Sequence, residues 1–455
     1  MAHGSDHDQS QSFLSRIFSI FAEVKPDEVV TAILLTVNVF LLLGSYYLLK
    51  TVREALILGE SGAVIKSYSA AGQALLLFLV IPAYAWLSSR VSRIKLVSFS
   101  SFFFFSNLLI FWILGKGGAD LGVPFYLWLG IYNNFIVAQF WGFANDLYNE
   151  EQGKRLFPII GIGSSLGAWV GTLYAKEFFK PLGPFNMLLV GAMVLGICMV
   201  LTIVVHRRES RRDQTQQKAA VEPLSRQGAF GLVMRTPYLR YIALLILLLN
   251  VVNSTGEFLL GSFVEQQAER TFGEGNEGKD ARRRFVGAFY GDFYSWVNLL
   301  GFLMQAFLAS RVLKYMGVRA ALFILPVIAL TGYSCLLMAP VLAIVRVVKI
   351  LENATDYSIM NTLRHALYLP TSRDAKYKAK ATNDTFVVRI GDMAQAGIVW
   401  VGTQLAFTIQ MFAGISLVFV LLWLGAAALL FREHRRITGE EPPATLPGEG
   451  APQQA

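Results

Sequence analysis

Long apolar stretches recur along this chain from Val29 to Phe431, and shorter polar segments separate them. A bilayer core about 30 Å thick needs roughly 20 apolar residues for each helical crossing. The stretches reach about that length, so the pattern predicts an all-α membrane protein with twelve transmembrane helices. The predicted ranges are 29–49, 68–88, 96–115, 122–145, 157–176, 185–205, 241–264, 287–309, 320–339, 341–362, 385–407 and 411–431.

The composition supports the same class of protein. Hydrophobic residues make up 54% of the chain, charged residues only 16%, and the mean hydropathy is +0.49. Soluble proteins average roughly 25% charged residues, so an ordinary soluble enzyme is excluded. The formal charge of +9 would suggest nucleic acid as a partner of a soluble protein, but no nucleic-acid motif accompanies it here. The two cysteines, Cys198 and Cys335, lie in apolar runs and offer neither a disulfide framework nor a Cys-rich metal site.

The distribution of Lys and Arg predicts the orientation in the membrane. Segments after the even-numbered runs carry about twice as many of these residues as the segments after the odd-numbered runs. Both termini are therefore expected in the cytoplasm, where the basic loops would meet anionic lipid headgroups. Residues 1–28 form a cytoplasmic N-terminal segment without the appearance of a cleavable signal peptide. Residues 432–455 form a cytoplasmic tail that is expected to be disordered.

A long basic connector, residues 206–240, divides the predicted helices into two sets of six, at 29–205 and 241–431. The basic segments 89–95 and 310–319 occupy equivalent places in the two sets and resemble one another. Short cytoplasmic loops are often basic without any repeat, and that alternative explains each loop taken alone. The shared position favours two six-helix bundles of the major facilitator type, which rock around a site near the bilayer midplane.

One predicted helix carries an unusual number of charges. Within 341–362, Arg346, Lys349, Glu352, Asn353 and Asp356 are spaced by three or four residues and share one helical face. An ionisable group at the bilayer centre costs about 3 kcal/mol on insertion scales, so such a face does not turn to lipid. Two interpretations remain open: a self-neutralising ladder that only holds the bundle together, and the wall of a water-filled translocation path. The second is the working prediction.

Further polar residues lie in other predicted helices. Glu257 has no local partner and needs a cation from another helix or a proton, whereas Arg389 and Asp392 are close enough to pair with each other. A lining rich in basic and amide groups suits an anionic substrate that forms hydrogen bonds. The remaining candidates for it are Lys50, Arg53, Asn134 and Asn145.

Motifs for other chemistries are missing from the sequence or lie in the wrong context. The sequence contains no G-x-x-x-x-G-K-[ST] phosphate loop and no H-E-x-x-H zinc motif. Gly161, Gly163, Gly167 and Gly171 lie inside a predicted membrane helix, where small residues allow close helix packing. Because no nucleophile–base pair or metal-ligand cluster is found, we predict no enzymatic activity, no cofactor and no metal.

Three segments resemble the bacterial and plastid nucleotide transporters, a family related to the major facilitators whose members exchange ATP for ADP. They are Tyr46–Leu56, Phe140–Pro158 and Asn353–Asp384. The resemblance implies a twelve-helix antiporter, here in the bacterial inner membrane. Its functional positions would fall on Arg53, Glu151, Glu257, Lys378 and Lys380.

Departures from the family pattern concern the charges. Arg53-Glu54 stands where the family usually has Lys-Asp, and an arginine fork is not equivalent to a lysine at a phosphate site. An acid is replaced at Asn361 and another at His365.

The sequence thus predicts a secondary active transporter that moves an anionic solute, most simply a nucleotide, by alternating access. Lys50, Arg53, Lys349, Lys378 and Arg389 would bind the anion. Glu257 and Glu151 would pair with these cations when the site is empty, and Glu352 and Asp356 are further candidates for coupling or gating. Two alternatives stay open. One is a proton-coupled carrier of another organic anion, and the other is a non-transporting membrane sensor or scaffold that works through the basic connector.

Overall fold

The computed structural model describes residues 28–439 except 89, 92, 149, 211–228, 373–374 and 376–378. Every regular element in this part of the chain is helical. Before the 211–228 gap come α2 (Val29–Glu60), α3 (Gly62–Ser88), α4 (Arg93–Lys116), α5 (Gly122–Leu147) and α6 (Glu150–Ser210). Gly183 has φ 73° and ψ 172°, which interrupts α6 between its two apolar parts. The predicted runs 157–176 and 185–205 lie on either side of this break.

The helices after the gap are more often interrupted by π-helical turns. They are α7 (Ala229–Arg235), α8 (Pro237–Phe272), α9 (Lys279–Met304), η1 (Gln305–Ala309), η2 (Val312–Met316), α10 (Gly317–Met338), α11 (Leu342–Thr355), η3 (Asp356–Met360), α12 (Asn361–Leu367), α13 (Lys380–Thr382), η5 (Asn383–Val387), α14 (Val388–Gln404) and α15 (Ile409–Thr438). Turns of this kind inside α-helices are often found at functional sites.

Each predicted apolar range overlaps helical residues, but several boundaries differ. Among the described residues, seven helices are long and apolar enough to cross a membrane by length and composition. The predicted connector 206–240 is shorter than expected, because α6 continues to Ser210 and both α7 and the start of α8 lie within it. The expectation of disorder from residue 432 was wrong at its start, since α15 continues to Thr438. Polar residues can extend a helix beyond an apolar span once the helix is nucleated.

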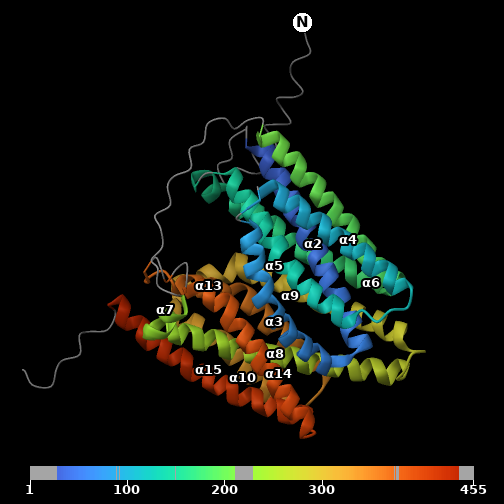
Figure 1. Ribbon diagram of the computed structural model, residues 1–455. Coiled ribbons are helices and arrows are strands. Elements are labelled where there is room, and N and C mark those ends of the chain that lie inside the picture. Colours follow the sequence, from blue (N-terminus) through green and yellow to red (C-terminus); the bar gives the residue numbers. More distant parts are fainter. Residues whose placement is uncertain are drawn as a thin grey trace, which may run out of the picture.

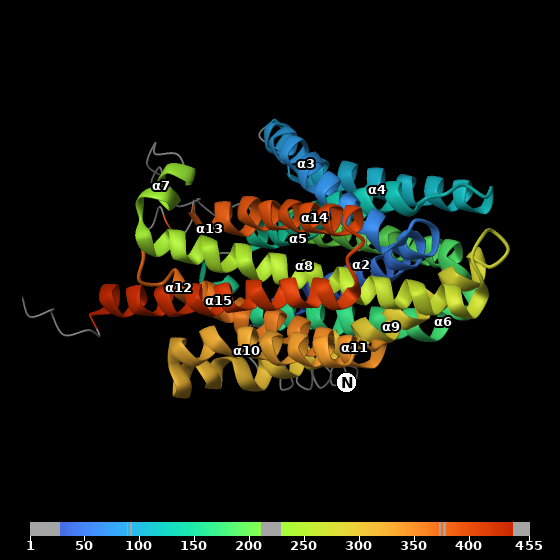
Figure 2. The same cartoon turned by 90° about the horizontal axis from the view of Figure 1, so that it is seen from below.

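The described residues form two hydrophobic cores. In Figure 1 the helices before and after the 211–228 gap gather into two groups. One core contains only residues between Leu35 and Val205, and the other is built mainly from residues between Val233 and Leu430. We call these parts the N-terminal and C-terminal lobes. Figure 2 shows α8 and α15 side by side in the C-terminal lobe. The lobes meet where α3 packs on α14 and where α6 packs on α9.

Glycines permit the closest helix contacts, as the sequence predicted. A Cβ atom on Gly167 would lie 2.1 Å from the carbonyl oxygen of Phe40, and one on Gly171 would lie 2.3 Å from that of Gly44. Both distances are too short for a real side chain. The small residues of α6 therefore let its backbone touch that of α2, as small residues do in membrane helices.

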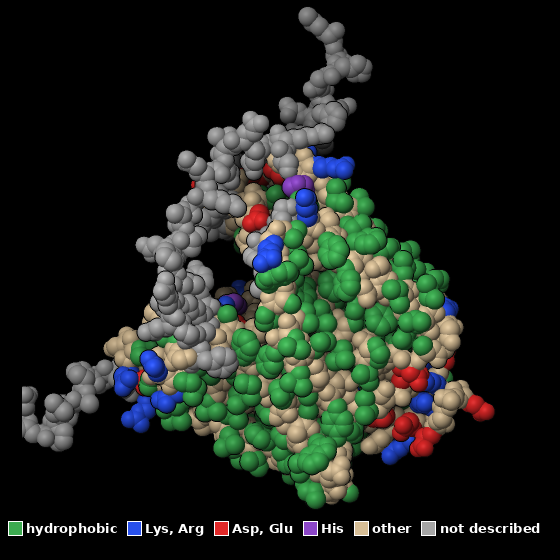
Figure 3. Space-filling model, viewed as in Figure 1, with side chains coloured by type: hydrophobic (Ala, Val, Ile, Leu, Met, Phe, Trp, Pro, Cys, Tyr) green, Lys and Arg blue, Asp and Glu red, His purple; other side chains and the backbone are tan. Residues whose placement is uncertain are grey.

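The lobes are tied together at one end, which we call the closed end. There Arg283 of α9 pairs with Glu60 of α2, and Glu265 of α8 accepts a 2.8 Å hydrogen bond from the backbone N–H of Ala63 in α3. Toward the opposite end, where α2 begins and α15 ends, the lobes diverge in Figure 1. Figure 3 shows a hollow between them, and a broad apolar surface with charged side chains gathered at its ends.

Candidate functional site

A cavity of about 290 Å³ lies between the two lobes. We call it the main cavity. Helices of both lobes contribute to its wall, and most of its lining side chains are polar, charged or tyrosine. Among the described residues that line it, the cations are Lys50, Arg53, Lys66 and Arg389, and the carboxylates are Glu257 and Asp392. Cations therefore outnumber carboxylates at its surface, which favours an anionic ligand.

Lys50 on α2 is held among aromatic rings. Its Nζ atom lies 4.2 Å from the ring centre of Tyr294, 5.3 Å from that of Tyr47 and 5.9 Å from that of Tyr357. Within the described part of the chain it has no hydrogen bond and no ion pair. The rings stabilise the ammonium group by cation–π attraction without neutralising its charge, so the charge stays available to a ligand.

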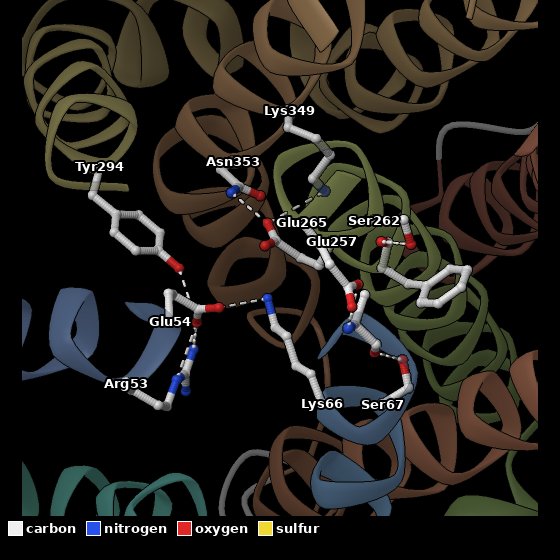
Figure 4. Close-up of polar contacts among 12 residues, drawn as sticks. Arg53, Glu54, Lys66, Ser67, Glu257, Ser262, Glu265, Tyr294, Lys349 and Asn353 are labelled. Carbon is white, nitrogen blue, oxygen red and sulfur yellow. Dashed lines mark hydrogen bonds and ion pairs between the residues drawn. The ribbon is translucent and has the colours of Figure 1, made fainter. Parts of the chain in front are cut away.

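Arg53 and Glu54 follow on the same helix, one turn closer to its end. Arg53 pairs with the carboxylate of Glu54, and its guanidinium lies 4.6 Å from the ring centre of Tyr126. Glu54 is fully buried and also receives Lys66 at 2.7 Å, as Figure 4 shows. The acid is thus shared by two cations, and the group of three keeps one excess positive charge beside the cavity.

Sequence reasoning missed Lys66 because the predicted second helix began at residue 68. In the structure, α2 ends only at Glu60 and α3 begins at Gly62, so Lys50, Arg53 and Lys66 are helical residues rather than loop residues. The prediction had counted all three as basic residues of the loop after the first apolar run. Without them, the difference in Lys and Arg count between the loops after even-numbered runs and those after odd-numbered runs becomes larger. The spacing of three between Lys50 and Arg53 was the available signal that the helix continues.

The charged face of α11 is mostly buried away from the cavity. Lys349 is 0% exposed, and its Nζ atom lies 3.0 Å from Glu352 and 3.7 Å from Glu257. Asp356 faces Arg364 at 3.5 Å. The prediction that Lys349, Glu352 and Asp356 line the path was therefore wrong for this conformation. Each of these groups finds its partner inside the C-terminal lobe, so the ladder interpretation describes them better.

Asn353 of α11 and Glu257 of α8 do line the main cavity. Asn353 donates a 3.0 Å hydrogen bond to Glu257. Figure 4 shows Lys349 and Asn353 of α11 converging on Glu257 of α8. Glu257 thus obtains its cation from another helix. It is the carboxylate that connects the buried ladder with the cavity.

Arg389 lines the cavity but is neutralised locally. Its guanidinium lies 2.8 Å from Asp392, three residues along α14. The same carboxylate accepts hydrogen bonds from Asn250 at 2.8 Å and Ser254 at 3.2 Å, both on α8. This pair adds no net charge, although Arg389 retains donors that a ligand can use.

The other predicted site residues lie elsewhere. Asn134 donates to Gly130 of its own helix and does not line the cavity, whereas its neighbour Asn133 does. Asn145 and Glu151 are exposed, near the end of α5 and the start of α6, and neither lines the cavity. Lys378 lies outside the described residues.

Lys380 contacts His365 instead of the cavity, with its Nζ atom 2.8 Å from Nδ1 of the imidazole. Burial, with Lys380 beside it, lowers the pKa of His365. A neutral imidazole can accept the hydrogen bond that a lysine ammonium donates. Elsewhere in the described chain, no group of three or more His, Cys, Asp or Glu is arranged to hold a metal ion.

Known proteins resemble this chain in sequence. The family model described as TLC ATP/ADP transporter matches residues 125–334. The ADP,ATP carrier protein 1 of Chlamydia muridarum is 22% identical over 352 residues, which cover 67% of this chain and 64% of the relative. The plastidic ATP/ADP-transporter of Solanum tuberosum is 25% identical over 354 residues, or 70% and 54% of the two chains. The chain thus spans less than two thirds of the length of these relatives.

Solved structures agree in fold. A bacterial homologue of the iron transporter ferroportin in its inward-facing state matches with a TM-score of 0.64 at 14% identity, over 89% of this chain and 98% of that one. A transporter of the POT family in complex with 5-aminolevulinic acid matches with a TM-score of 0.65 at 13% identity, over 90% and 96%. The predicted resemblance is confirmed: residues 125–334 match the model of the TLC ATP/ADP transporters, full-length relatives are named as ADP,ATP carriers, and the described residues share an all-helical fold with solved transporters.

Proposed function

We propose that this protein is a secondary active transporter that exchanges nucleotides, of the ATP/ADP type. The observation that carries the proposal is Lys50, a cation in the main cavity without an ion pair among the described residues. Arg53 and Lys66 add one further positive charge after pairing with Glu54. A phosphate chain would satisfy these groups through charge-assisted hydrogen bonds. We take the nucleotide as the substrate because the relatives are named as ADP,ATP carriers.

The proposed architecture has twelve crossings in two six-helix bundles, 29–205 and 241–431, in the bacterial inner membrane with both termini in the cytoplasm. The two hydrophobic cores and the break at Gly183 support this division. With this orientation, the closed end faces away from the cytoplasm and the hollow opens inward. Transport then requires the contacts of the closed end to part while the lobes meet at the other end.

The transport cycle needs neither a covalent step nor a cofactor, so the protein acts as a carrier and not as an enzyme. An empty cavity with excess positive charge is unfavourable to move through the low-dielectric bilayer. A bound nucleotide neutralises that charge. Exchange is therefore favoured over net uptake. Glu257, which lies between Lys349 and the cavity, is the group whose pairing would change between the loaded and the empty state.

The test is uptake of labelled ATP by proteoliposomes that contain the full chain and are preloaded with ADP, with phosphate or with nothing. We expect uptake only with internal nucleotide. Glu257→Gln should lower the rate at least tenfold while leaving thermal stability close to wild type, because glutamine keeps the shape of the side chain and its bond with Asn353. Normal exchange by this variant would remove Glu257 from the mechanism.

The rival proposal is a proton-coupled carrier of another organic anion. The acids replaced at Asn361 and His365 favour a cargo that differs from that of the nucleotide exchangers. It predicts no uptake of labelled ATP, but uptake of a labelled organic anion that follows an imposed pH gradient, needs no internal nucleotide and is not competed by ATP. A protein that only serves as a sensor or scaffold would take up neither label under any loading. The same liposomes, tested with both labels, separate all three outcomes.

A further inference from the structure

A second cavity of about 170 Å³ adjoins the main one, with which it shares Tyr357. It lies between α6 of the N-terminal lobe, which contributes Ser164 and Ser165, and the α9–η1 segment of the C-terminal lobe, which contributes Asn298 and Gln305. The function derived above makes no use of this space. Its position on the seam between the lobes means that any ligand in it touches both of them.

The chemistry of the second cavity contrasts with that of the main cavity. None of its described lining residues is charged. Its wall contains hydroxyl and amide groups together with the rings of Tyr47, Phe302 and Tyr357. Neutral donors and acceptors between aromatic faces suit a planar heterocycle or a sugar, since bases stack on such rings and form hydrogen bonds at their edges. They offer nothing to compensate a phosphate.

Several of these polar groups are available to a ligand. Ser164 has no hydrogen-bond partner among the described residues. Asn298 donates a 3.2 Å bond to the carbonyl oxygen of Ala168, which leaves its own Oδ1 as an acceptor. The oxygen of Gln305 accepts from Thr362 at 3.2 Å, which leaves its amide N–H groups as donors. Donors and acceptors are thus both present, as recognition of a base edge requires.

The backbone around this cavity is also unusual. Gln305 is the first residue of the π-helical turn η1, and Tyr357 lies within the π-helical turn η3. Both turns therefore contribute to one small cavity. Such turns are frequent at functional sites, because they orient side chains in directions that a regular α-helix does not allow.

Lys50 connects the two spaces. Two of the three rings that surround its ammonium group, Tyr47 and Tyr357, also line the second cavity. We infer that the second cavity binds the nucleoside part of the nucleotide while its phosphates lie in the main cavity against Lys50 and Arg53. Ser164, Asn298 and Gln305 then determine which base is accepted. This inference rests on the proposed function.

The test fills the second cavity without touching the main one. In Ser164→Leu the longer side chain enters the empty space, and Ser106→Leu on α4 is the matched control, because Ser106 lines neither cavity and bonds only within its own helix. Thermal unfolding of the purified full chain is followed with increasing ATP, GTP, adenosine or inorganic tripolyphosphate. We expect Ser164→Leu to raise the half-saturating ATP concentration by about tenfold, the equivalent of losing one or two good hydrogen bonds. Tripolyphosphate should act on it as on wild type.

Each other outcome has a defined meaning. If Ser164→Leu binds ATP like wild type, or loses tripolyphosphate together with ATP, the division between the cavities is wrong. If the control shows the same loss, the effect does not come from this cavity and the inference falls. If wild type responds to tripolyphosphate but equally to all nucleotides and not to adenosine, nucleotides bind through their phosphates alone. If wild type responds to no nucleotide and exchanges none, the proposed function itself fails.

Discussion

Helices α2 and α11 each carry a run of charged side chains into the middle of the molecule, but only the run on α2 faces the main cavity. On α11, Lys349 and Glu352 are buried against each other. On α2, Lys50 lies among aromatic rings and forms no ion pair with any described residue. The comparison teaches that the density of charge along a helix does not identify a binding site. What identifies it is the charge that the rest of the protein leaves uncompensated.

The reason lies in the energetics of buried ions. A charge removed from water is tolerated when an opposite charge and hydrogen bonds replace its solvation, and such a pair then has little left to offer a ligand. A cation that faces a polar cavity keeps access to solvent and needs no such partner. The buried pairs of α11 therefore stabilise the C-terminal lobe, while Lys50 is free to bind.

The largest expected effect is on stability and comes from the buried ladder. Lys349→Met leaves the carboxylates of Glu352 and Glu257 without their nearest cation, so we expect a loss of about 3–5 kcal/mol in the free energy of unfolding. Denaturant titration in detergent micelles measures it. Adding Glu352→Leu to this variant should recover most of the loss, because the uncompensated buried charge is then removed. A single variant as stable as wild type would contradict the role of Lys349 as buried counter-ion.

The second effect concerns binding, and it should appear at Lys50. Lys50→Met removes the uncompensated cation, so we expect the half-saturating ATP concentration for exchange to rise by about ten- to a hundredfold, or about 1.5–3 kcal/mol. The free energy of unfolding should change by less than about 1 kcal/mol, because no ion pair is broken. Lys50→Arg keeps the charge and serves as control. An unchanged concentration dependence would place the anion elsewhere.

A smaller effect is expected where α2 meets α3 at the closed end. Gly62 has φ +86°, and a Cβ atom there would lie 2.2 Å from Oε1 of Glu265. Gly62→Ala should therefore weaken this end by about 1–2 kcal/mol, because the added methyl group displaces the carboxylate that accepts the hydrogen bond from the backbone N–H of Ala63. Modification of Asn133→Cys by an impermeant thiol reagent, added from the closed side in a background without Cys198 and Cys335, reports on the opening.

The control for this variant is Gly118→Ala. Gly118 has φ +89° in the neighbouring turn, with nothing within 4 Å of an added Cβ atom. It introduces similar strain without displacing the carboxylate of Glu265. We expect labelling of the cavity cysteine to accelerate about five- to thirtyfold in Gly62→Ala and to stay unchanged in the control. Equal rates in both would show that Glu265 does not hold the lobes together.

The smallest effect is expected for an exposed pair near the end of α15. Arg436 lies 2.8 Å from Glu433 and its side chain is 66% exposed. Glu433→Gln should change the free energy of unfolding by less than about 1 kcal/mol, because solvent screens such a pair. The same denaturant titration checks it. A loss comparable to that of Lys349→Met would show that burial does not distinguish these two kinds of pair.

Much of the helical layout follows from the sequence. A membrane-spanning helix satisfies its own backbone hydrogen bonds and can be recognised by the length of its apolar stretch. The close contact of α6 with α2 at Gly167 and Gly171 follows in the same way from small residues at fixed spacing. The boundaries were less certain. The predicted helix 29–49 stopped short because Lys50, Arg53 and Glu54 interrupt the apolar run, although in the structure they continue α2 to Glu60.

The sequence by itself determined that this is a helical membrane protein that resembles nucleotide carriers, and that its buried charges need either partners or a cavity. Only the tertiary structure decided which charges form ion pairs and which line the cavity, because the partners come from distant parts of the chain. Glu54 meets Lys66 of the next helix, and Lys349 meets Asn253 and Glu257, more than ninety residues earlier. Helical spacing places a side chain on a face of its helix, but the other helices determine whether that face is buried or lines the cavity.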